Sequence, residues 1–569
     1  MKICPKCKNR FTDDTTVCEF CNVELQEIPV GHNRRKKESK FDAVIGSLTA
    51  KLPFKMPVKL AKLILSAVAL IIVVAIVLAI FIPSGEPNYM LYVQDGELMF
   101  SFVSDANGMP LDDSGISSNT VVLSKDGSKI FYLDSDNNLY YKDVKNLSAE
   151  GQKLSSKVSK FFVSDNASLV TYIETDKDLK QHNLKSESKT IAKDVESVLV
   201  APNGKKMLIK QVSEDGSLDL LLSKDGKETD KIVSNINYVY SVSDDFKTFY
   251  FSKNNAIYSY KEGKDKHEKI IKEFSSVVRC YDSGEIYYTK SVVDESGVGV
   301  ETLCFFDGKE SKTVFKGYNA NNTQCAVNKP VMIFASAANE EGKVEFYLAN
   351  GAEKSSLNYD IQKIFLEPTG DDIYFITDVE DTTGEGDLYS AKIKKNELAD
   401  VKQVASDVYK GKYLADNTFV FISDTSLDTR IGDLYLNSSD KEIAKNVNLE
   451  SVYYVPQKNI IVFFSDIKEA AAKLNYFSNN RVTEIDEDVY VGDFYATASG
   501  DLMYIKDFDL NEAEGDLYIS NTGEGKFVAD EVTKIINVYS KAFSDHLESG
   551  YGSYFASSSM TTNEKGNFF

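Results

Sequence analysis

The segment Val489–Asp530 reads VYVGDFYATASGDLMYIKDFDLNEAEGDLYISNTGEGKFVAD, and this stretch decides the fold. It contains four short runs rich in Tyr, Phe, Ile and Val, separated by clusters of Asp, Asn, Gly and Ser. This pattern is typical of β-strands joined by tight turns. A four-stranded sheet of this size cannot bury both faces alone, so neighbouring units must stack against it. The predicted strands are Val489–Ala496, Asp501–Lys506, Gly515–Ser520 and Lys526–Asp530.

A turn followed by a Leu-Tyr strand recurs through the chain. Successive copies are centred 37 to 46 residues apart, and a four-stranded propeller blade has a period of about 40–45 residues. The predicted fold class is therefore mainly β, a β-propeller. The clear copies are Asn138-Leu139-Tyr140, Ala256-Ile257-Tyr258, Asp387-Leu388-Tyr389, Asp433-Leu434-Tyr435 and Asp516-Leu517-Tyr518, and weaker ones centre on Leu98, Leu179, Leu220, Leu303, Phe346 and Leu474.

The two ends of the array predict that the propeller closes into a ring. The array begins at a second strand, Tyr89–Val93, and ends on a first strand, Thr533–Tyr539. This stagger lets the last strand complete the first blade and cover its edge. The repeats number eleven, whereas typical rings hold about four to eight blades. Two tandem propellers over residues 88–320 and 321–540, joined near 310–330, are therefore favoured over one large propeller.

The pattern over residues 89–540 resembles the blades of TolB-like and WD-repeat-like propellers in bacterial envelope proteins. This resemblance implies a binding platform. It carries no catalytic or binding residue over to this chain, because no repeat matches closely enough.

Residues 63–82 read LILSAVALIIVVAIVLAIFI, with no charged side chain. A helix of this length covers about 30 Å, the thickness of the hydrocarbon core of a bilayer. Lysines crowd its N-terminal side, and the next Lys or Arg after it is Lys125. The positive-inside rule therefore predicts a single-pass protein with a cytoplasmic N-terminus and an extracytoplasmic C-terminal region. The flanking lysines are Lys51, Lys55, Lys59 and Lys62.

The first residues predict a metal site. They read MKICPKCKNRFTDDTTVCEFCNVEL, with two Cys-x-x-Cys pairs separated by ten residues. Four thiolates at this spacing suit a tetrahedral structural Zn²⁺, and the metal would supply the folding energy that so short a segment lacks. A redox role is less favoured because the βαβ surroundings of thioredoxin-like motifs are absent. The predicted ligands are Cys4, Cys7, Cys18 and Cys21.

This segment resembles the short zinc-ribbon module at the N-termini of many bacterial membrane proteins, in which a glycine follows each cysteine pair. Here Lys8 and Asn22 occupy those two positions, and Asn tolerates a left-handed backbone better than Lys does. The resemblance covers about residues 1–26 and implies a structural metal, because four sulfur ligands leave no open position.

Residues 27–62 predict a basic juxtamembrane linker. The run GHNRRKKESK at Gly31–Lys40 favours a disordered segment that contacts anionic lipid over a nucleic-acid patch. Apolar residues then recur at helical spacing, which predicts a short amphipathic helix on the inner leaflet or a contact with a partner. These residues are Phe41, Val44, Ile45, Leu48 and Leu52.

Charge and cysteine content exclude some classes of function. The net charge is −21, which argues against nucleic acid as the main partner. The first 62 residues are nevertheless basic, so the two parts of the chain should face different environments. Cys280, Cys304 and Cys325 are too few for a disulfide-stapled fold. Three small buried residues are favoured over one bridge plus a free thiol.

Catalytic motifs are not evident. His182, His267 and His546 have no partner at metal-ligand spacing, and no G-x-S-x-G, Walker or H-E-x-x-H motif occurs. The acidic hairpin loops Asp378–Asp387, Asp424–Asp433 and Asp507–Asp516 are expected on one face of the propeller. Two alternations resemble calcium ligands but lack the glycine of the full motif, so solvated turns are favoured over Ca²⁺. They are Asp507, Asp509 and Asn511, and Asp134, Asp136 and Asn138.

The first hypothesis is a non-enzymatic binding, scaffold or sensor protein of the bacterial cell envelope, whose propeller binds a protein, peptide or glycan. The second is a surface enzyme that processes glycans or peptides on a propeller. The third is a cytoplasmic regulator whose ribbon binds protein or nucleic acid. The ligand and the oligomeric state stay open, and residues 541–569, rich in Ser, Gly and Asn, predict a flexible tail.

Overall fold

The computed structural model describes residues 88–536, with short gaps, and parts of residues 2–27. The chain divides into two units, Met1–Gly85 and Glu86–Phe569. Among the described residues no helix is long and apolar enough to cross a membrane. The predicted span at 63–82, most of the linker at 27–62 and the tail at 541–569 lie outside them. The gaps in the second unit are 112–119, 126, 227–228, 265–266, 294–296, 298, 328, 340–341, 416, 427–428 and 498.

The first unit contains a small antiparallel sheet in the order β2-β1-β3. Lys2 lies opposite Phe11 on one side and Glu27 on the other. A single bridge between Val17 and Glu24 forms a further hairpin. The strands are β1 (Lys2–Ile3), β2 (Arg10–Phe11) and β3 (Gln26–Glu27).

The first part of the second unit consists of six separate four-stranded antiparallel sheets. Their strands follow one another in chain order, as the repeat predicts, and one 3₁₀ helix, η2 (Val144–Asn146), follows β9. The sheets are β7 (Val122–Leu123), β8 (Lys129–Leu133), β9 (Leu139–Asp143) and β10 (Gln152–Ser155); β11 (Val158–Val163), β12 (Leu169–Glu174), β13 (Leu179–Asn183) and β14 (Ser188–Ala192); β15 (Val195–Val200), β16 (Lys206–Val212), β17 (Leu218–Lys224) and β18 (Thr229–Val233); β19 (Tyr238–Val242), β20 (Thr248–Lys253), β21 (Ala256–Lys261) and β22 (Glu268–Ile271); β23 (Ser276–Cys280), β24 (Ile286–Val293), β25 (Gly299–Phe306) and β26 (Ser311–Lys316); and β27 (Tyr318–Cys325), β28 (Val331–Ser336), β29 (Phe346–Asn350) and β30 (Glu353–Ser356).

The remaining strands form one continuous hydrogen-bonded sheet of sixteen. It is continuous because four long strands each serve two neighbouring repeats. Its strands are β31 (Ile361–Leu366), β32 (Asp372–Thr377), β33 (Gly386–Lys394), β34 (Glu397–Ala415), β35 (Thr418–Ser426), β36 (Ile431–Leu436), β37 (Ser438–Val455), β38 (Ile460–Lys468), β39 (Ala471–Ser478), β40 (Arg481–Ala496), β41 (Leu502–Asp509), β42 (Glu514–Ser520), β43 (Lys526–Ile535), β4 (Tyr89–Gln94), β5 (Glu97–Phe102) and β6 (Asp105–Pro110).

Each long strand changes partners at one buried valine. In β34, Val408 lies opposite Gly386 of β33 and also opposite Ser423 of β35. The strand is therefore the fourth strand of one repeat before Val408 and the first strand of the next repeat after it. Val447, Val489 and Val532 hold the same position in β37, β40 and β43.

Small residues opposite these valines let the strands bend. A Cβ atom at Gly515, which faces Val532, would lie 2.7 Å from the carbonyl oxygen of Lys506. This is closer than nonbonded atoms approach, so the turn from one repeat into the next requires glycine there. Gly386 and Gly432 have similarly close neighbours, and Ala472 fills the fourth position.

The two ends of the second unit pair with each other. Tyr92 lies opposite Ile535, Val93 opposite Lys534 and Gln94 opposite Val532. The last part of β43 is thus the first strand of a sheet whose other strands are β4, β5 and β6, which is the closure that the sequence predicts. We call this pairing of β43 with β4 the seam.

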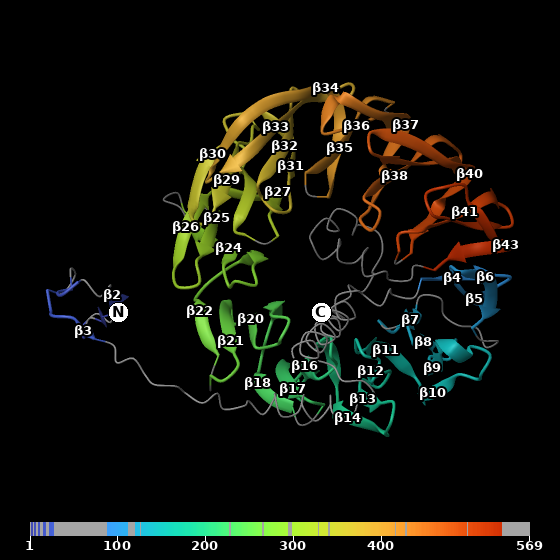
Figure 1. The fold of residues 1–569 in the computed structure, drawn as a ribbon, viewed down its shortest axis with the longest axis horizontal. Coiled ribbons are helices and arrows are strands. Elements are labelled where there is room, and N and C mark those ends of the chain that lie inside the picture. The colour runs from blue at the N-terminus through green and yellow to red at the C-terminus, as the bar shows by residue number, and fades with distance from the viewer. Residues whose placement is uncertain are drawn as a thin grey trace. The chain divides into compact units, whose positions relative to one another are not determined.

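Counted in this way, the described part of residues 88–536 forms eleven four-stranded sheets, which follow one another around a ring (Figure 1). Apolar clusters join neighbouring sheets. At the seam, Met90 and Tyr92 pack with Met503 and Leu517 of the preceding sheet. On its other side the closing sheet packs through Leu91 and Phe100 against Ile130 and Tyr132 of the next one.

The sheets also continue across residues 310–330, where the sequence analysis placed a join between two propellers. Leu303 and Phe305 of one sheet share a buried cluster with Met332 and Phe334 of the next. The second unit therefore follows the alternative of one large propeller, because sheets on the two sides of the predicted join bury apolar side chains against each other.

The seam gives a test of the fold. Ile535 is fully buried where β42, β43 and β4 meet, so Ile535→Ala should destabilise the closing sheet by about 2–4 kcal/mol through lost burial and a cavity. The neighbouring exposed residue gives the control, Lys534→Ala, which should cost less than about 0.5 kcal/mol. Urea unfolding followed by tyrosine fluorescence measures both. Equal effects of the two variants would contradict the closure.

Candidate functional site

Of the four predicted zinc ligands, the structure describes one. Cys18 is fully buried, and its carbonyl oxygen accepts a hydrogen bond of 2.9 Å from the Asn22 backbone N–H. Asn22 has a φ of 51°, the left-handed conformation for which glycine usually serves at this position. Cys4, Cys7 and Cys21 lie outside the described residues, among which no group of three metal-ligating side chains occurs. The turn after Cys18 is compatible with a Cys-x-x-Cys pair, and the metal stays a prediction.

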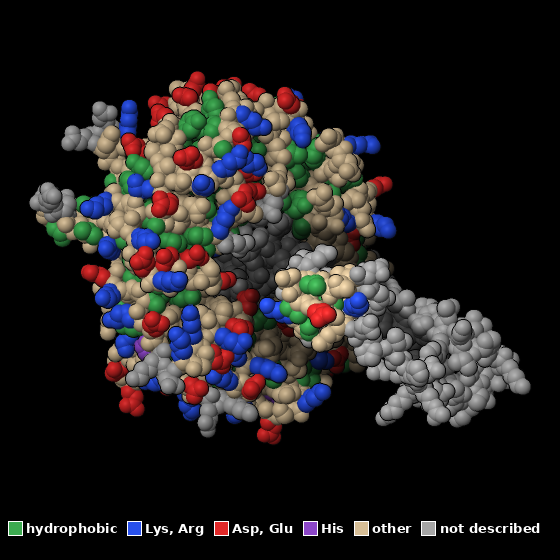
Figure 2. All heavy atoms as spheres, turned by 60° about the vertical axis from the view of Figure 1, so that its left-hand side comes forward, with side chains coloured by type: hydrophobic (Ala, Val, Ile, Leu, Met, Phe, Trp, Pro, Cys, Tyr) green, Lys and Arg blue, Asp and Glu red, His purple; other side chains and the backbone are tan. Residues whose placement is uncertain are grey.

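The predicted acidic loops join the second and third strands of their sheets, as expected. Antiparallel strands alternate in direction, so all second-to-third connections leave the same face of the ring. We call it the acidic face. The connection between β32 and β33, residues 378–385, carries four carboxylates and no Lys or Arg. On the side of the molecule that Figure 2 shows, by contrast with this loop, Lys and Arg side chains are interspersed with Asp and Glu.

Both alternations that resemble calcium ligands use their carboxylates to hold turns. Asp509 Oδ1 accepts from the backbone N–H of Asn511 at 2.7 Å and of Glu512 at 3.3 Å, and these bonds hold the pKa of Asp509 below its ordinary value. Asp134 likewise accepts from the N–H groups of Asp136 and Asn138. Both carboxylates thus have a role in the local turn.

The opposite face of the ring carries the connections between first and second strands, and we call it the turn face. At its start, Asn88 Nδ2 donates to Asp501 Oδ2 at 2.7 Å and to Ser499 Oγ at 2.6 Å. Asp501 Oδ1 also pairs with Lys458 Nζ at 2.7 Å, with side chains 7% and 16% exposed. Burial alone would raise the pKa of Asp501, but the hydrogen bonds from Lys458, Ser499 and Asn88 outweigh it and lower the pKa.

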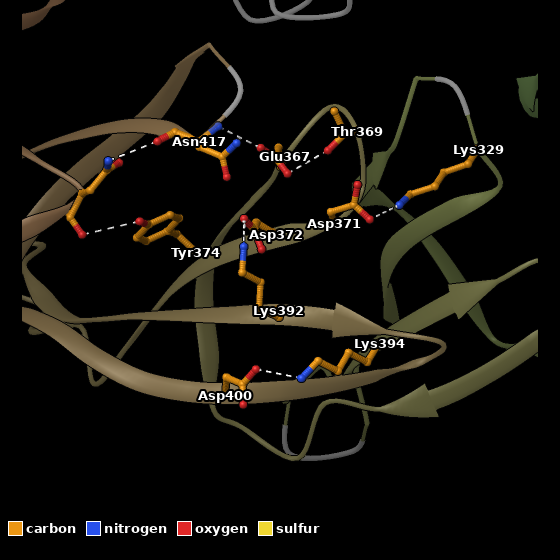
Figure 3. Close-up of polar contacts among 11 residues, drawn as sticks. Lys329, Glu367, Thr369, Asp371, Asp372, Tyr374, Lys392, Lys394, Asp400 and Asn417 are labelled. Atoms are coloured by element: carbon orange, nitrogen blue, oxygen red, sulfur yellow. Dashed lines mark hydrogen bonds and ion pairs between the residues drawn. The ribbon is translucent and has the colours of Figure 1, made fainter.

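A second polar cluster on the turn face surrounds Glu367 (Figure 3). Glu367 is 2% exposed; its Oε1 accepts from the Asn417 backbone N–H at 3.0 Å and its Oε2 accepts from Thr369 Oγ1 at 2.7 Å. Asp372 pairs with Lys392 at 2.5 Å. Burial, followed by the charges of Asp372 and Glu367, raises the pKa of Tyr374 to about 12. Each of these carboxylates thus has a hydrogen-bond donor or a cation beside it.

The turn-face ion pairs repeat from sheet to sheet. Lys125 pairs with Asp165, Lys329 with Asp371 and Lys458 with Asp501, with sequence separations of 40, 42 and 43 residues. In each pair the lysine and the aspartate lie in equivalent turns of adjacent sheets. The sequence analysis did not predict these ion pairs between sheets, although Lys and Asp residues spaced one repeat apart could have indicated them. The arrangement joins sheets rather than concentrating reactive groups.

The inner strands contain one buried amine near neutral pKa. Lys412 of β34 is 8% exposed, and burial lowers its pKa to about 7, although Glu450 opposes the shift. Beside it, Lys410 pairs with Glu450 at 2.6 Å. Lys363 of β31 donates to the carbonyl oxygens of Gly384 and Tyr409 at 2.7 and 2.6 Å. The bonds from Lys363 connect the first strands of two neighbouring sheets.

The cysteines of the second unit are free thiols; Cys304 is buried, as the reading as small buried residues predicts, whereas Cys280 and Cys325 are partly exposed. Burial raises the pKa of Cys280 and of Cys325 to about 12. Neither thiol is therefore ionised near neutral pH, and thiolate is the reactive form. His182 and His267 belong to different sheets, and burial lowers the pKa of both. His546 lies outside the described residues.

No protein-family model and no curated protein matches this chain. Solved structures similar to it include a crystal structure of the eukaryotic initiation factor, 10% identical over 79% of this chain and 97% of that one, with a TM-score of 0.38. The tricorn protease is 11% identical over 82% of this chain and 64% of that one, with a TM-score of 0.24.

The β-propeller domain of the Trilobed protease from Pyrococcus furiosus is 12% identical over 59% of this chain and 97% of that one, with a TM-score of 0.24. Because all three TM-scores are low, the fold assignment depends on the strand pairing of this chain itself.

The buried ion pair on the turn face gives a prediction. Asp501→Asn removes the charge that compensates the nearly buried Lys458, so it should cost about 2–3 kcal/mol at neutral pH. The lowered pKa of Asp501 means that the wild-type advantage is present above about pH 4 and is lost as pH falls further. Asp371→Asn, at a side chain 67% exposed, should cost less than about 1 kcal/mol. Equal losses for both variants would contradict a special role for Asp501.

The thiols give another prediction. In the native protein at about pH 8, Cys280 and Cys325 should react only slowly with 5,5′-dithiobis(2-nitrobenzoate), because both residues are partly buried and their thiols are protonated. They should react at once in denaturant. Glu187→Cys, at an exposed position, is the positive control for reagent access. Rapid native modification of Cys280 or Cys325, identified by mass spectrometry, would contradict this burial.

Proposed function

We propose that this chain is a membrane-anchored, extracytoplasmic propeller of the bacterial cell envelope that acts as a non-enzymatic binding, scaffold or sensor protein. A structural zinc ribbon would lie on the cytoplasmic side. The proposal has one main support: an uncharged apolar segment at residues 63–82 directly precedes a large closed ring of sheets with polar loops on both faces.

The membrane part of the proposal comes from the sequence. The apolar segment is long enough to span a bilayer, and four lysines precede it whereas no Lys or Arg follows until Lys125. Membrane lipid is then the first partner. The zinc part depends on Cys4, Cys7, Cys18 and Cys21. Four thiolates would hold the ion without an open position, so the metal would stabilise the ribbon and perform no chemistry.

The connection to the propeller favours one orientation. Five residues, 83–87, separate the apolar segment from Asn88, and they span at most about 18 Å when fully extended. Asn88 is held by Ser499 and Asp501 on the turn face. We therefore place the turn face toward the membrane and the acidic face away from it, where a protein, peptide or glycan can approach.

The polar contacts support binding over catalysis. Asp501, Glu367 and Asp372 each have donors or cations as partners, and such groups tie sheets together. The loop at residues 378–385 carries four carboxylates on the acidic face, and Lys363 donates to its Gly384 carbonyl oxygen close to Glu385. A negative face of this kind steers and selects partners by charge.

The proposal is tested on the full-length protein in its membrane. Single cysteines at two exposed positions, Glu512→Cys on the acidic face and Glu524→Cys on the turn face, should both react with a membrane-impermeant maleimide on intact cells. Fluorophores at the two positions should differ, because a quencher on the lipid headgroup should affect only the Glu524→Cys label. Labelling only after permeabilisation would contradict the extracytoplasmic placement.

The same preparation tests the metal and the binding role. The purified full-length chain should contain about one zinc per molecule, and Cys4→Ser with Cys21→Ser should lose it. An envelope protein, peptide or glycan retained by the chain should be released by Glu380→Gln with Asp381→Asn. If the protein contains no zinc, only the zinc-ribbon part of the proposal is contradicted. If the purified chain converts a substrate, the non-enzymatic binding role is contradicted and catalysis takes its place.

A further inference from the structure

The seam is the place where the two ends of the second unit hold each other. It is formed by three register pairs between β43 and β4, and the equivalent first and second strands of the preceding sheet, β40 and β41, share four. Side chains add two bonds: Thr533 Oγ1 donates to the Val93 carbonyl oxygen at 3.4 Å, and Gln94 Nε2 donates to Asp530 Oδ1 at 3.1 Å.

Carboxylates gather at the end of the seam where Gln94 pairs with Val532, which we call the outer end. Val532 lies opposite both Gln94 and Gly515. Three acids directly adjoin these residues in sequence, on three neighbouring strands spaced about 4.8 Å apart. They are Asp95, Glu514 and Glu531.

The register brings two of these acids close together. Asp95 follows Gln94 and Glu531 precedes Val532, so the two carboxylates occupy neighbouring positions on the two strands of the seam, where like charges weaken strand pairing. The charges of Asp95, Asp530 and Glu514 raise the pKa of Glu531. Burial, then Glu512, Asp95 and Asp509, raise the pKa of Glu514.

The positive charge near this end of the seam is already engaged. Asp516, on β42, also has a raised pKa, caused by burial and by the charges of Asp507 and Asp530. Lys506 lies opposite Asp516 on β41, but its Nζ pairs with Asp486 at 2.8 Å. The ion pair with Asp486 therefore limits how far Lys506 can neutralise the carboxylates at the seam.

The other end of the seam, where Tyr92 pairs with Ile535 and which we call the inner end, also has a carboxyl group beside it. Asp493 of β40 accepts a hydrogen bond of 3.2 Å from the backbone N–H of Ile535, the last seam residue of β43. Burial raises the pKa of Asp493 to about 6, although this hydrogen bond and the charge of Lys534 oppose the shift. Ionisation of Asp493 above that pH places a charge in partly buried surroundings.

We propose that the seam is a pH-dependent latch, which is held more firmly when the carboxyl groups at its two ends are protonated and which loosens as these groups ionise. The sign follows from linkage. A carboxyl group with a raised pKa binds protons more tightly in the folded state, so its stabilising effect is present at low pH and is lost as the pH rises through the folded pKa. Loosening would expose the edges of β4 and β43, which other strands can pair with. This latch goes beyond the proposed function and does not depend on it, because it concerns strand pairing within the ring.

Hydrogen exchange of the full-length protein in detergent tests the latch. Peptides covering residues 89–94 and 530–536 should lose protection by roughly threefold or more between about pH 5 and pH 7.5, after correction for intrinsic exchange rates. Peptides covering residues 206–224, in an internal sheet, should keep theirs. Seam protection that is constant or rises over this range would overturn the proposal.

Variants separate the two ends of the seam. Glu531→Gln and Asp493→Asn each remove one titrating group, so each should reduce the pH dependence of seam protection, and together they should remove most of it. Glu187→Gln, an exposed glutamate in the β13–β14 connection, is the matched control and should change nothing. Asp95→Asn provides a second variant at the outer end if Glu531→Gln folds poorly. A double variant that keeps the full pH dependence would also overturn the proposal.

Discussion

The pairing of β43 with β4 is the contact on which the rest of the second unit depends. Each four-stranded sheet has two faces with apolar side chains, and each face is buried only when another sheet packs against it. A series of such sheets with free ends would leave two apolar faces in water. The pairing of Gln94 with Val532 and of Tyr92 with Ile535 joins the ends and gives every described sheet two neighbours. Residues more than 400 positions apart therefore decide whether the whole series is stable.

In the later part of the ring, single long strands continue from one sheet into the next, and this continuity determines which residues lie at the junctions. Val408, Val447, Val489 and Val532 mark where a long strand leaves one partner and joins another, and Gly386, Gly432, Ala472 and Gly515 face them. A valine fills the buried corner, and a small residue lets the backbones approach. The ion pairs on the turn face serve a related purpose. Because adjacent sheets differ by about one repeat in sequence, Lys and Asp about 40 residues apart meet in space.

The two faces of the ring therefore differ in how their charges are compensated. On the turn face Lys458, Lys329 and Lys125 pair with aspartates of the next sheet. On the acidic face some carboxylates accept backbone hydrogen bonds, as Asp509 and Asp134 do, and others pair with lysines, as Asp433 and Glu174 do. At the seam, carboxylates lie close to one another. This closeness makes the strand pairing at the seam sensitive to protons.

The sequence by itself determined the strands, the repeat and the closure. Alternating apolar residues, turns of Asp, Asn and Gly, and a spacing near 40 residues are local signals, and the strands around Leu388, Leu434 and Leu517 lie where those signals predicted them. The left-handed turn at Asn22 was also readable, since asparagine tolerates it. What only the tertiary structure decided are the contacts between sheets. One ring rather than two, the Lys458–Asp501 tie, the buried amine of Lys412, and the meeting of Asp95 with Glu531 all depend on which sheets become neighbours. Local sequence cannot specify these, because the residues involved come from different repeats and meet only when the ring closes.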